Sequence, residues 1–443
     1  MVKRTFTATI ILIILMMAWS AQAWAAPDYS VPPNIEARSA VLIDANTGEI
    51  LFAKNKDERL PMASLTKIMT ALIVLETYDP TDVVVIDNNT QSGADARFIL
   101  KKGEKYTIDT LLYALMLVSS NESATALASA GTSEEAFIAR MNERAQNIGA
   151  KDTHFVTPHG LPEEGHYSTA HDMALIAREA MKNENFRKYV GTNEAKVNAT
   201  TLQKARTIVN SNRLLNDSKA NVMVYGKSRA IAYKGTIGIK TGHTEEAGTC
   251  LAADVKKNSE ELISVVMNGD TNLAYQDTIN LFEYGFNNFK AVSIFKSGTT
   301  QESMPVAGGK QRFVDAVITE NIKGAIPNGA SASAIEIKVD SAGEIQAPVT
   351  KGAIIGTAVA YYKGKKLCET PLKAGASVEK SLFNAGGFVS ALIKIVLIAA
   401  AILFLIIVVA LIRSSLLRRR GSFSGRSKND FTSRQVSRIK RLR

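Results

Sequence analysis

The chain has 443 residues, which is longer than one typical domain and long enough to bury two hydrophobic cores. Hydrophobic residues make up 46% of it, and this share excludes an intrinsically disordered protein. The formal net charge of +11 would suit a nucleic-acid-binding protein, but the basic residues gather at the two ends. Residues 413–443 hold eleven Lys/Arg and one Asp, whereas the body from 27 to 412 is nearly neutral, so we expect no nucleic-acid partner.

The N-terminus has the pattern of an exported protein. Lys3 and Arg4 precede an apolar run, and Ala23 and Ala25 form an A-x-A cleavage pattern. These features predict a signal peptide over residues 1–25, with an uncleaved membrane anchor as the alternative.

The body begins and ends with strand patterns and has helical patterns between them. Two alternating stretches in 39–55, joined by Asn-Thr-Gly, predict a hairpin, and apolar residues at helical spacing after Ser64 predict a buried helix. Another helix is expected after a capping box formed by Thr132 and Glu135. After Lys234 the pattern changes to strands. If the first and last strands share a sheet, the fold is α/β, with a largely antiparallel sheet flanked by helices.

The remainder predicts two further domains and a membrane anchor. After a first domain over 26–286, the short alternating runs of 287–380 predict a small all-β domain, followed by a linker over 381–387. Residues 388–412 include eighteen consecutive apolar residues, enough for a single transmembrane helix across a hydrocarbon core of about 30 Å. The basic segment 413–443 then predicts a cytoplasmic tail. We therefore expect a single-pass cell-membrane protein whose domain over 26–286 is extracytoplasmic.

Cysteines and histidines give no sign of a metal centre. Cys250 and Cys368 fall in different predicted domains, so a disulfide is possible but not favoured. No spacing among the five histidines and two cysteines resembles a zinc site, and no glycine-rich phosphate loop is present. We expect neither a metal nor a cofactor.

The motif that indicates chemistry begins in "MASLTKIMTA", where Ser64 and Lys67 lie three residues apart. The same S-x-x-K spacing recurs at Ser293, Ser377 and Ser437. Those copies fall in the predicted β domain or tail, where no helix is expected. Only the copy at Ser64 is followed in order by S-x-N, Ser119–Asn121, and K-T-G, Lys240–Gly242.

With these motifs the chain resembles the low-molecular-weight penicillin-binding proteins, specifically the serine D-alanyl-D-alanine carboxypeptidases. The stretches "TPHGLPEEGHYST" and "IGIKTGHTEEAGT" also match, and the resemblance covers roughly residues 35–380. It implies a DD-peptidase/β-lactamase-like fold that removes the terminal D-alanine from peptidoglycan stem peptides and is acylated by β-lactam antibiotics. Ser120 departs from the family, which commonly has glycine there. The C-terminal span also departs, because many relatives lie on the membrane through an amphipathic helix.

The residue types themselves account for the first step of this chemistry. A serine hydroxyl is a poor nucleophile until a neighbour accepts its proton, and Lys67 can reach Ser64 because residues three apart share a helix face. Burial and a second cation, Lys240, both favour the neutral amine that a base requires. The Ser64 backbone N–H, at a helix start, suits an oxyanion hole. Gly242 has no side chain, so a substrate backbone could lie against its strand.

The resemblance implies the remaining roles. Ser119 would relay a proton to the leaving amine, and Asn121 would hold the substrate amide. Lys240 and Thr241 would bind the terminal carboxylate, and the backbone of His243 would supply the second oxyanion donor.

Several other interpretations stay open. A β-lactamase shares all three motifs, and Glu163 or Glu164 could be the glutamate that some of these enzymes use in deacylation. A DD-endopeptidase would use the same site on cross-links, and a non-catalytic wall-binding protein could keep the same fold. Ser119 and Asn121 could be a helix terminus and its cap. We interpret the following histidines as structural: His159, His166 and His171.

Overall fold

The structure, a computed structural model, describes residues 28–87, 98–341, 343–381 and 385–423. The predicted signal peptide and the part of the predicted tail after residue 423 lie outside the described residues. The catalytic region, the β-strands that follow it and the C-terminal helix are described below one at a time.

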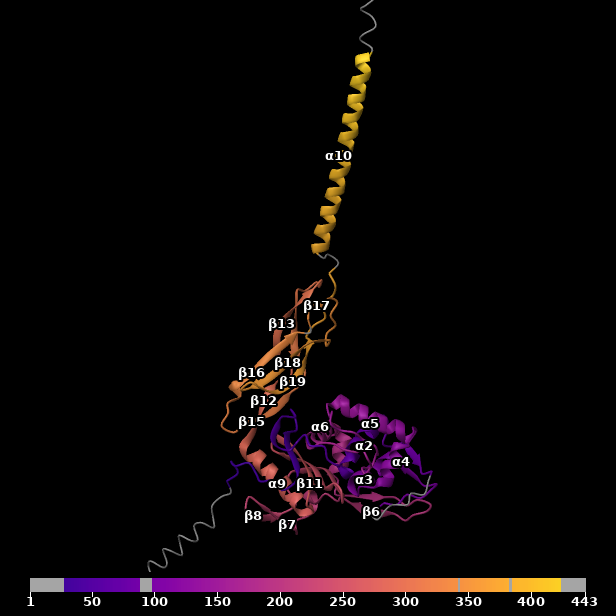
Figure 1. The fold of residues 1–443 in the computed structure, drawn as a ribbon, viewed down its shortest axis with the longest axis vertical. Coiled ribbons are helices and arrows are strands. Elements are labelled where there is room, and N and C mark those ends of the chain that lie inside the picture. The colour runs from indigo at the N-terminus through magenta and orange to yellow at the C-terminus, as the bar shows by residue number, and fades with distance from the viewer. Residues whose placement is uncertain (1–27, 88–97, 342, 382–384, 424–443) are drawn as a thin grey trace, which may run out of the picture. The chain divides into compact units, whose positions relative to one another are not determined.

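A five-stranded antiparallel sheet organises the first region (Figure 1). Its strands, in spatial order, are β2 (Ile50–Lys54), β1 (Ser39–Asp44), β11 (Glu260–Gly269), β10 (Gly248–Lys257) and β9 (Thr236–Thr244). The first strand of the chain pairs with a late one, with Ser39 opposite Met267 and Asp44 opposite Leu262. The prediction of one antiparallel sheet built from the first and last strands is confirmed.

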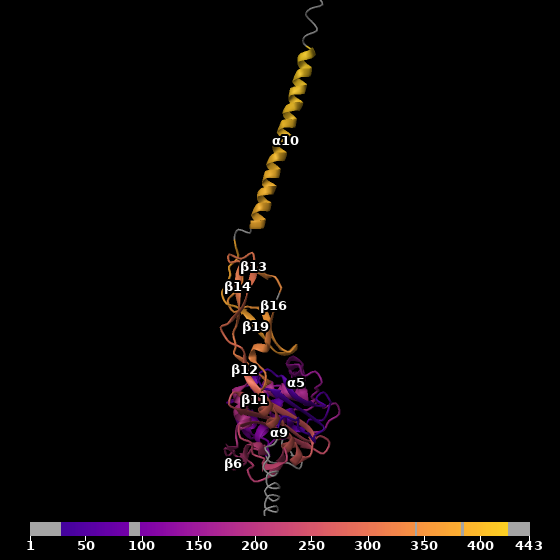
Figure 2. The same cartoon turned by 90° about the vertical axis from the view of Figure 1, so that its left-hand side faces the viewer.

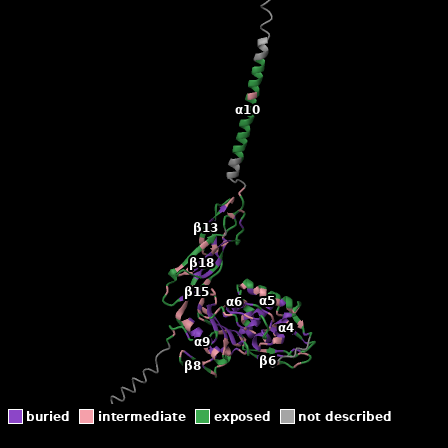
Figure 3. Ribbon diagram, in the orientation of Figure 1, coloured by how far each residue is buried: buried purple, intermediate pink, exposed green. Residues whose placement is uncertain are grey.

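Both faces of this sheet are buried, because alternate side chains of each strand point to opposite faces. On β1, Val41 and Ile43 belong to one hydrophobic core and Ala40 and Leu42 to the other. Helices from the middle of the chain cover the first face: α2 (Lys67–Thr77), α3 (Ile108–Leu117), α4 (Asn121–Ala128), α5 (Glu134–Ile148), α6 (Ala170–Ala180) and α7 (Glu184–Gly191). Helix α9 (Thr271–Asn288) covers the second face. Figure 3 shows the buried residues concentrated along these elements.

Shorter elements complete this region. They are η1 (Ala63–Thr66), α8 (Arg213–Asn216) and the paired strands β3 (Val83–Val85) with β4 (Lys105–Thr107), β5 (Glu194–Val197) with β6 (Arg206–Val209), and β7 (Asn221–Val224) with β8 (Lys227–Ala230). Helix α5 begins one residue later than predicted. Its cap is Ser133, whose side chain accepts from the N–H of Ala136, so the predicted cap at Thr132 is wrong.

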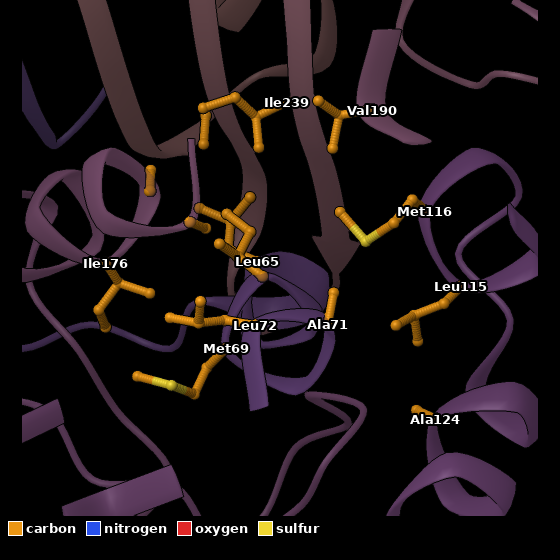
Figure 4. Close-up of a cluster of buried hydrophobic side chains, with 14 of the residues drawn as sticks. Leu65, Met69, Ala71, Leu72, Leu115, Met116, Ala124, Ile176, Val190 and Ile239 are labelled. Carbon is orange, nitrogen blue, oxygen red and sulfur yellow. The ribbon is translucent and has the colours of Figure 1, made fainter. Parts of the chain in front are cut away.

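The part of helix α2 from Lys67 to Val74 is surrounded by protein, and this holds Lys67 in place at the start of the helix. Every residue from Lys67 to Val74 is buried. In Figure 4, Met69 and Leu72 lie toward Ile176, whereas Ala71 lies toward Leu115. Each buried leucine or methionine side chain contributes about 1.5–3 kcal/mol, so the helix is firmly held. Lys67, the first residue of this helix, therefore lies on a rigid element.

The chain after α9 is rich in β-structure, as predicted. Strand β12 (Phe289–Phe295) pairs with β15 (Ile322–Pro327). A six-stranded sheet has the order β16 (Ile335–Ser341), β18 (Ile354–Tyr362), β19 (Lys365–Ala374), β14 (Phe313–Ile318), β13 (Thr300–Ala307) and β17 (Ile345–Gln346). A short 3-10 turn, η2 (Ala332–Ala334), lies between β15 and β16. Cys368, on β19, and Cys250, on β10, are buried free thiols, so no disulfide joins them.

The last described element is α10 (Ala385–Phe423), a continuous helix in both views (Figures 1 and 2). Its apolar part, Ala391–Leu417, has 27 residues and a mean hydropathy of 3.6, and none of it is buried against the protein. At 1.5 Å per residue this part is about 40 Å long, which is enough to cross a membrane. The helix runs past both ends of the predicted span, 388–412.

Candidate active site

Ser64 lies in the 3-10 turn η1, directly before α2. Residues three apart eclipse each other in such a turn, and Nζ of Lys67 lies 2.9 Å from Oγ of Ser64. The spacing predicted this approach, although it placed Ser64 in an α-helix rather than in a 3-10 turn. Ala63, just before the serine, has φ +47°, a left-handed conformation that alanine rarely adopts.

The amine of Lys67 is enclosed by oxygen atoms from three separate segments. The side chain is fully buried. Besides Ser64, Nζ contacts Oδ1 of Asn121 at 2.7 Å and the backbone oxygen of His159 at 2.6 Å. The first and second motifs therefore meet at this amine.

The S-x-N motif occupies the connection between α3 and α4. Ser119 has φ +60°, a conformation that non-glycine residues adopt mainly at strained or functional positions. Ser120 is the cap of α4, because its Oγ accepts from the N–H of Ser123 at 3.0 Å. Asn121, the first helical residue, uses its side chain on Lys67 instead of on the helix end. The residue that departs from the family pattern thus has a structural role, and the capping role considered for Ser119 and Asn121 belongs to it.

The K-T-G motif lies on β9, an edge strand of the sheet. Lys240 is buried, and its Nζ donates to the backbone oxygen of Thr241 at 2.7 Å. The hydroxyl of Thr241 lies 3.2 Å from that of Ser211. A Cβ atom on Gly242 would lie 2.9 Å from the backbone nitrogen of Ser64, so the strand passes in contact with η1, the turn that contains Ser64. Alternation on a strand places Lys240 and Gly242 on the same face.

His243 follows the motif and is exposed. Its Nδ1 lies 3.1 Å from Oγ1 of Thr249, which lies 3.0 Å from Oγ1 of Thr271. These contacts hold the imidazole beside β10 and leave its backbone next to Gly242.

The loop that carries His159 contributes backbone oxygen atoms to the site, which the sequence did not predict. Its backbone contacts α2 twice, through the carbonyl of His159 to Lys67 and through the carbonyl of Pro158, which accepts from Thr70 at 2.6 Å. Burial, with a smaller contribution from the nearby Lys67, lowers the pKa of His159 to about 4. The imidazole ring was interpreted as structural. The part of His159 that reaches the site is its backbone oxygen, and a contact of this kind cannot be predicted from the residue type.

The other candidates have different surroundings. Glu163 and Glu164 are exposed. Ser293 lies on β12, and Oγ of Ser377 accepts from the backbone N–H of Lys351. The last copy of the motif, at Ser437, lies outside the described residues.

Comparison with known families identifies two matching segments. A family model described as D-alanyl-D-alanine carboxypeptidase matches residues 26–271. A second, described as penicillin-binding protein 5, C-terminal domain, matches residues 289–380.

Individual relatives match along most of their length. The chain is 32% identical to the D-alanyl-D-alanine carboxypeptidase DacF of Bacillus subtilis (strain 168), over 85% of this chain and 95% of the relative. It is 32% identical to DacA of Escherichia coli (strain K12), over 77% and 83% respectively. Among solved structures it is similar to penicillin binding protein 5 from Haemophilus influenzae, with 29% identity, a TM-score of 0.61, and coverage of 79% of this chain and 99% of that chain.

Proposed function

The chain belongs to the S11 peptidase family of D-alanyl-D-alanine carboxypeptidases, and on that premise we propose that it removes the terminal D-alanine of peptidoglycan stem pentapeptides through an acyl-Ser64 intermediate. Peptidoglycan is the substrate expected for the family, and β-lactam antibiotics are expected to acylate the same serine. The roles of individual residues below are part of this proposal.

The observation that carries the mechanism is the set of contacts at Nζ of Lys67. Oδ1 of Asn121 and the backbone oxygen of His159 can only accept hydrogen bonds. A neutral amine has two N–H bonds and one lone pair, so these two acceptors take both hydrogens. The lone pair then faces Oγ of Ser64, the one partner of the three that can donate a proton. Lys67 is thereby oriented as the general base.

Attack follows from this arrangement. The proton on Oγ of Ser64 moves to Lys67, and Oγ forms a bond to the carbonyl carbon of the penultimate D-alanine. Negative charge develops on the carbonyl oxygen and is stabilised by the backbone N–H groups of Ser64 and His243. The contact between Gly242 and the Ser64 nitrogen supports this pairing, because it brings the two donors to one place.

The remaining residues hold the substrate and assist the leaving group. Asn121 accepts from Lys67 through Oδ1, so its Nδ2 group can donate to the substrate amide. Lys240 and Thr241 bind the terminal carboxylate. The C–N bond breaks as the proton held by Lys67 passes through the Ser119 hydroxyl to the departing amine. D-alanine leaves, Lys67 is neutral again, and water hydrolyses the acyl-Ser64 ester.

The test uses the full-length protein in detergent. A peptide ending in D-Ala-D-Ala should release D-alanine, and benzylpenicillin should leave a stable covalent label on Ser64. The Ser64→Ala variant should lose both while keeping its melting temperature. Rapid turnover of benzylpenicillin with recovery of free enzyme would favour a β-lactamase instead, and D-alanine release by the Ser64→Ala variant would refute the proposal.

We also propose a domain layout and a membrane topology. The two family matches support a catalytic domain over 26–286 and a small β domain over 287–380. The linker expected over 381–387 overlaps the first residues of α10, which begins at Ala385. The apolar part of α10 supports a single span, and the basic residues after it support a cytoplasmic tail. Protease added to intact spheroplasts should digest the catalytic domain and spare a C-terminal tag. Digestion of the tag would indicate the opposite orientation in the membrane.

A further inference from the structure

A directed series of hydrogen bonds joins the loop 156–166 to η1, the turn that contains Ser64. The backbone N–H of Val156 donates to Nδ1 of His166 at 2.9 Å. Nε2 of His166 lies 2.9 Å from Oγ1 of Thr66, and the Thr66 hydroxyl donates to the carbonyl oxygen of Ala63 at 2.8 Å. His166 is only 7% exposed and Thr66 is fully buried, so water does not replace these bonds.

Chemistry fixes the direction of each bond in this series. A backbone N–H can only donate, so Nδ1 of His166 must accept and the ring proton must be on Nε2. Nε2–H then donates to Thr66, which leaves the hydroxyl proton of Thr66 for the carbonyl of Ala63. The ring must be neutral, because a proton on Nδ1 would face the N–H of Val156.

The series ends on the peptide group that joins Ala63 to Ser64. A peptide group is planar, so the orientation of its C=O also sets the orientation of its N–H. That N–H belongs to Ser64 and is one of the two donors of the proposed oxyanion hole. A Cβ atom on Gly160 would lie 2.0 Å from the oxygen of this peptide, and one on Gly242 would lie 2.9 Å from its nitrogen. The C=O thus faces the loop, and the N–H lies beside β9.

We propose that His166 is a positioning residue for the oxyanion hole: acting through Thr66, it holds the Ala63–Ser64 peptide with the Ser64 N–H directed at the scissile carbonyl. This role rests on the proposed function of Ser64 as the nucleophile. The bond to the carbonyl also polarises the peptide, which strengthens its N–H as a donor. From the sequence His166 was interpreted as structural, and the structure assigns it this more specific task.

The ionisable groups around His166 keep its ring neutral. Burial, with smaller contributions from His154 and Lys67, lowers the pKa of His166 to about 4. Burial also lowers the pKa of the nearby His159 to about 4. The series is therefore complete at neutral pH, and it breaks when the ring is protonated in acid.

The experiment compares paired variants of the full-length protein in detergent. His166→Ala and Thr66→Val remove the series, whereas His166→Gln keeps an N–H that can donate to Thr66 and Thr66→Ser keeps the hydroxyl. His171→Gln is the matched control, because the ring of His171 lies beside Asp57 and Asp172 and is not a member of the series. The measurements are the rate constant of acylation by benzylpenicillin, and kcat and KM for D-alanine release from a peptide ending in D-Ala-D-Ala.

We expect acylation and kcat to fall by about 10- to 100-fold in His166→Ala and Thr66→Val, with KM within about threefold of the unaltered enzyme. His166→Gln and Thr66→Ser should recover most of the rate. Below pH 5 the unaltered enzyme should lose acylation rate relative to His166→Gln, because glutamine does not titrate. Melting curves establish that each variant is folded, and the Thr66 pair decides the question if His166→Ala does not fold.

An unchanged rate of acylation in both His166→Ala and Thr66→Val would overturn the proposal. So would equal losses in His166→Gln and His166→Ala, since the ring shape rather than its hydrogen bonds would then matter. An unaltered enzyme that neither releases D-alanine nor reacts with benzylpenicillin would instead refute the proposed function on which this role rests.

Discussion

Gly242 on strand β9 leaves room for only a hydrogen atom beside the backbone nitrogen of Ser64, since a Cβ there would lie 2.9 Å away. We expect Gly242→Ala to push the strand from the nucleophile turn. Acylation by benzylpenicillin should fall by about tenfold or more, and the free energy of unfolding by roughly 1–3 kcal/mol. Labelling rates and denaturant titration measure the two effects.

Gly329 is the matched control for this change, because a Cβ there would meet no atom within 4 Å. Gly329→Ala should leave both quantities unchanged. Equal effects of the two substitutions would show that the contact between β9 and the turn is not what matters.

Lys67 should not tolerate arginine. Arginine stays protonated and cannot accept the proton of Ser64, so Lys67→Arg should lower the acylation rate by about 10²- to 10⁴-fold. Lys182→Arg is the control, because Lys182 is an exposed partner of Glu179. Rates are compared by stopped-flow labelling with a fluorescent penicillin. A Lys67→Arg enzyme that retains its acylation rate would eliminate this lysine as the base.

Ser120 should stabilise α4 as its cap. Ser120→Ala removes the acceptor for the N–H of Ser123 and should cost about 1 kcal/mol, whereas Ser120→Gly should cost only a few tenths. For a domain of this size, 1 kcal/mol corresponds to a shift of about 2–4 °C in the melting temperature. Differential scanning calorimetry of the two variants should rank glycine above alanine, and the reverse order would argue against a capping role.

Stability should decrease as the pH falls from about 6.5 to about 4. In this window the unfolded chain binds protons on His159 and His166, while burial keeps both rings neutral in the folded protein, where each pKa is about 4. The unfolded state therefore binds more protons, so the free energy of unfolding rises with pH and levels off above 6.5. Each histidine contributes on the order of 1–3 kcal/mol.

The pH prediction is checked by melting curves across pH 4–7. His159→Asn retains an acceptor for the N–H of Leu161 and does not titrate, so it should weaken the pH dependence. An unchanged slope in this variant would remove His159 from the explanation.

Removal of α10 should release the protein from the membrane. A chain ending at Lys380 lacks the apolar part of the helix, Ala391–Leu417. After ultracentrifugation we expect it in the soluble fraction and the full-length protein in the membrane pellet, with both labelled by penicillin. A truncated, labelled chain that stays in the pellet would show that another segment binds the membrane.

The sequence could predict those contacts that follow from spacing along one segment. Ser64 and Lys67 meet because they lie three positions apart in a helical turn. Residue types also predicted the antiparallel sheet and the long apolar helix. The start of α5 was misplaced because Thr132 and Ser133 are both good capping residues, and propensity does not choose between such neighbours.

Contacts made by backbone atoms could not be predicted in this way. The carbonyl of His159 binds Lys67, and the carbonyl of Ala63 receives the Thr66 hydroxyl. Every residue has a carbonyl, so only the folded loop selects these two. The close approach of Gly242 to Ser64 likewise depends on how β9 packs against η1, and the order of the motifs alone does not determine it.

The pairing of β1 with β11 has a consequence for biosynthesis. A nascent chain that has grown only as far as α7 already contains Ser64, Lys67 and Asn121, but it lacks β9, β10 and β11. Such a chain lacks the strand with Lys240 and Thr241, which we propose bind the substrate carboxylate, and β1 has no partner other than β2. Hydrolytic competence therefore arrives late and all at once, when distant strands close the sheet, and long-range closure of this kind is intrinsically slow.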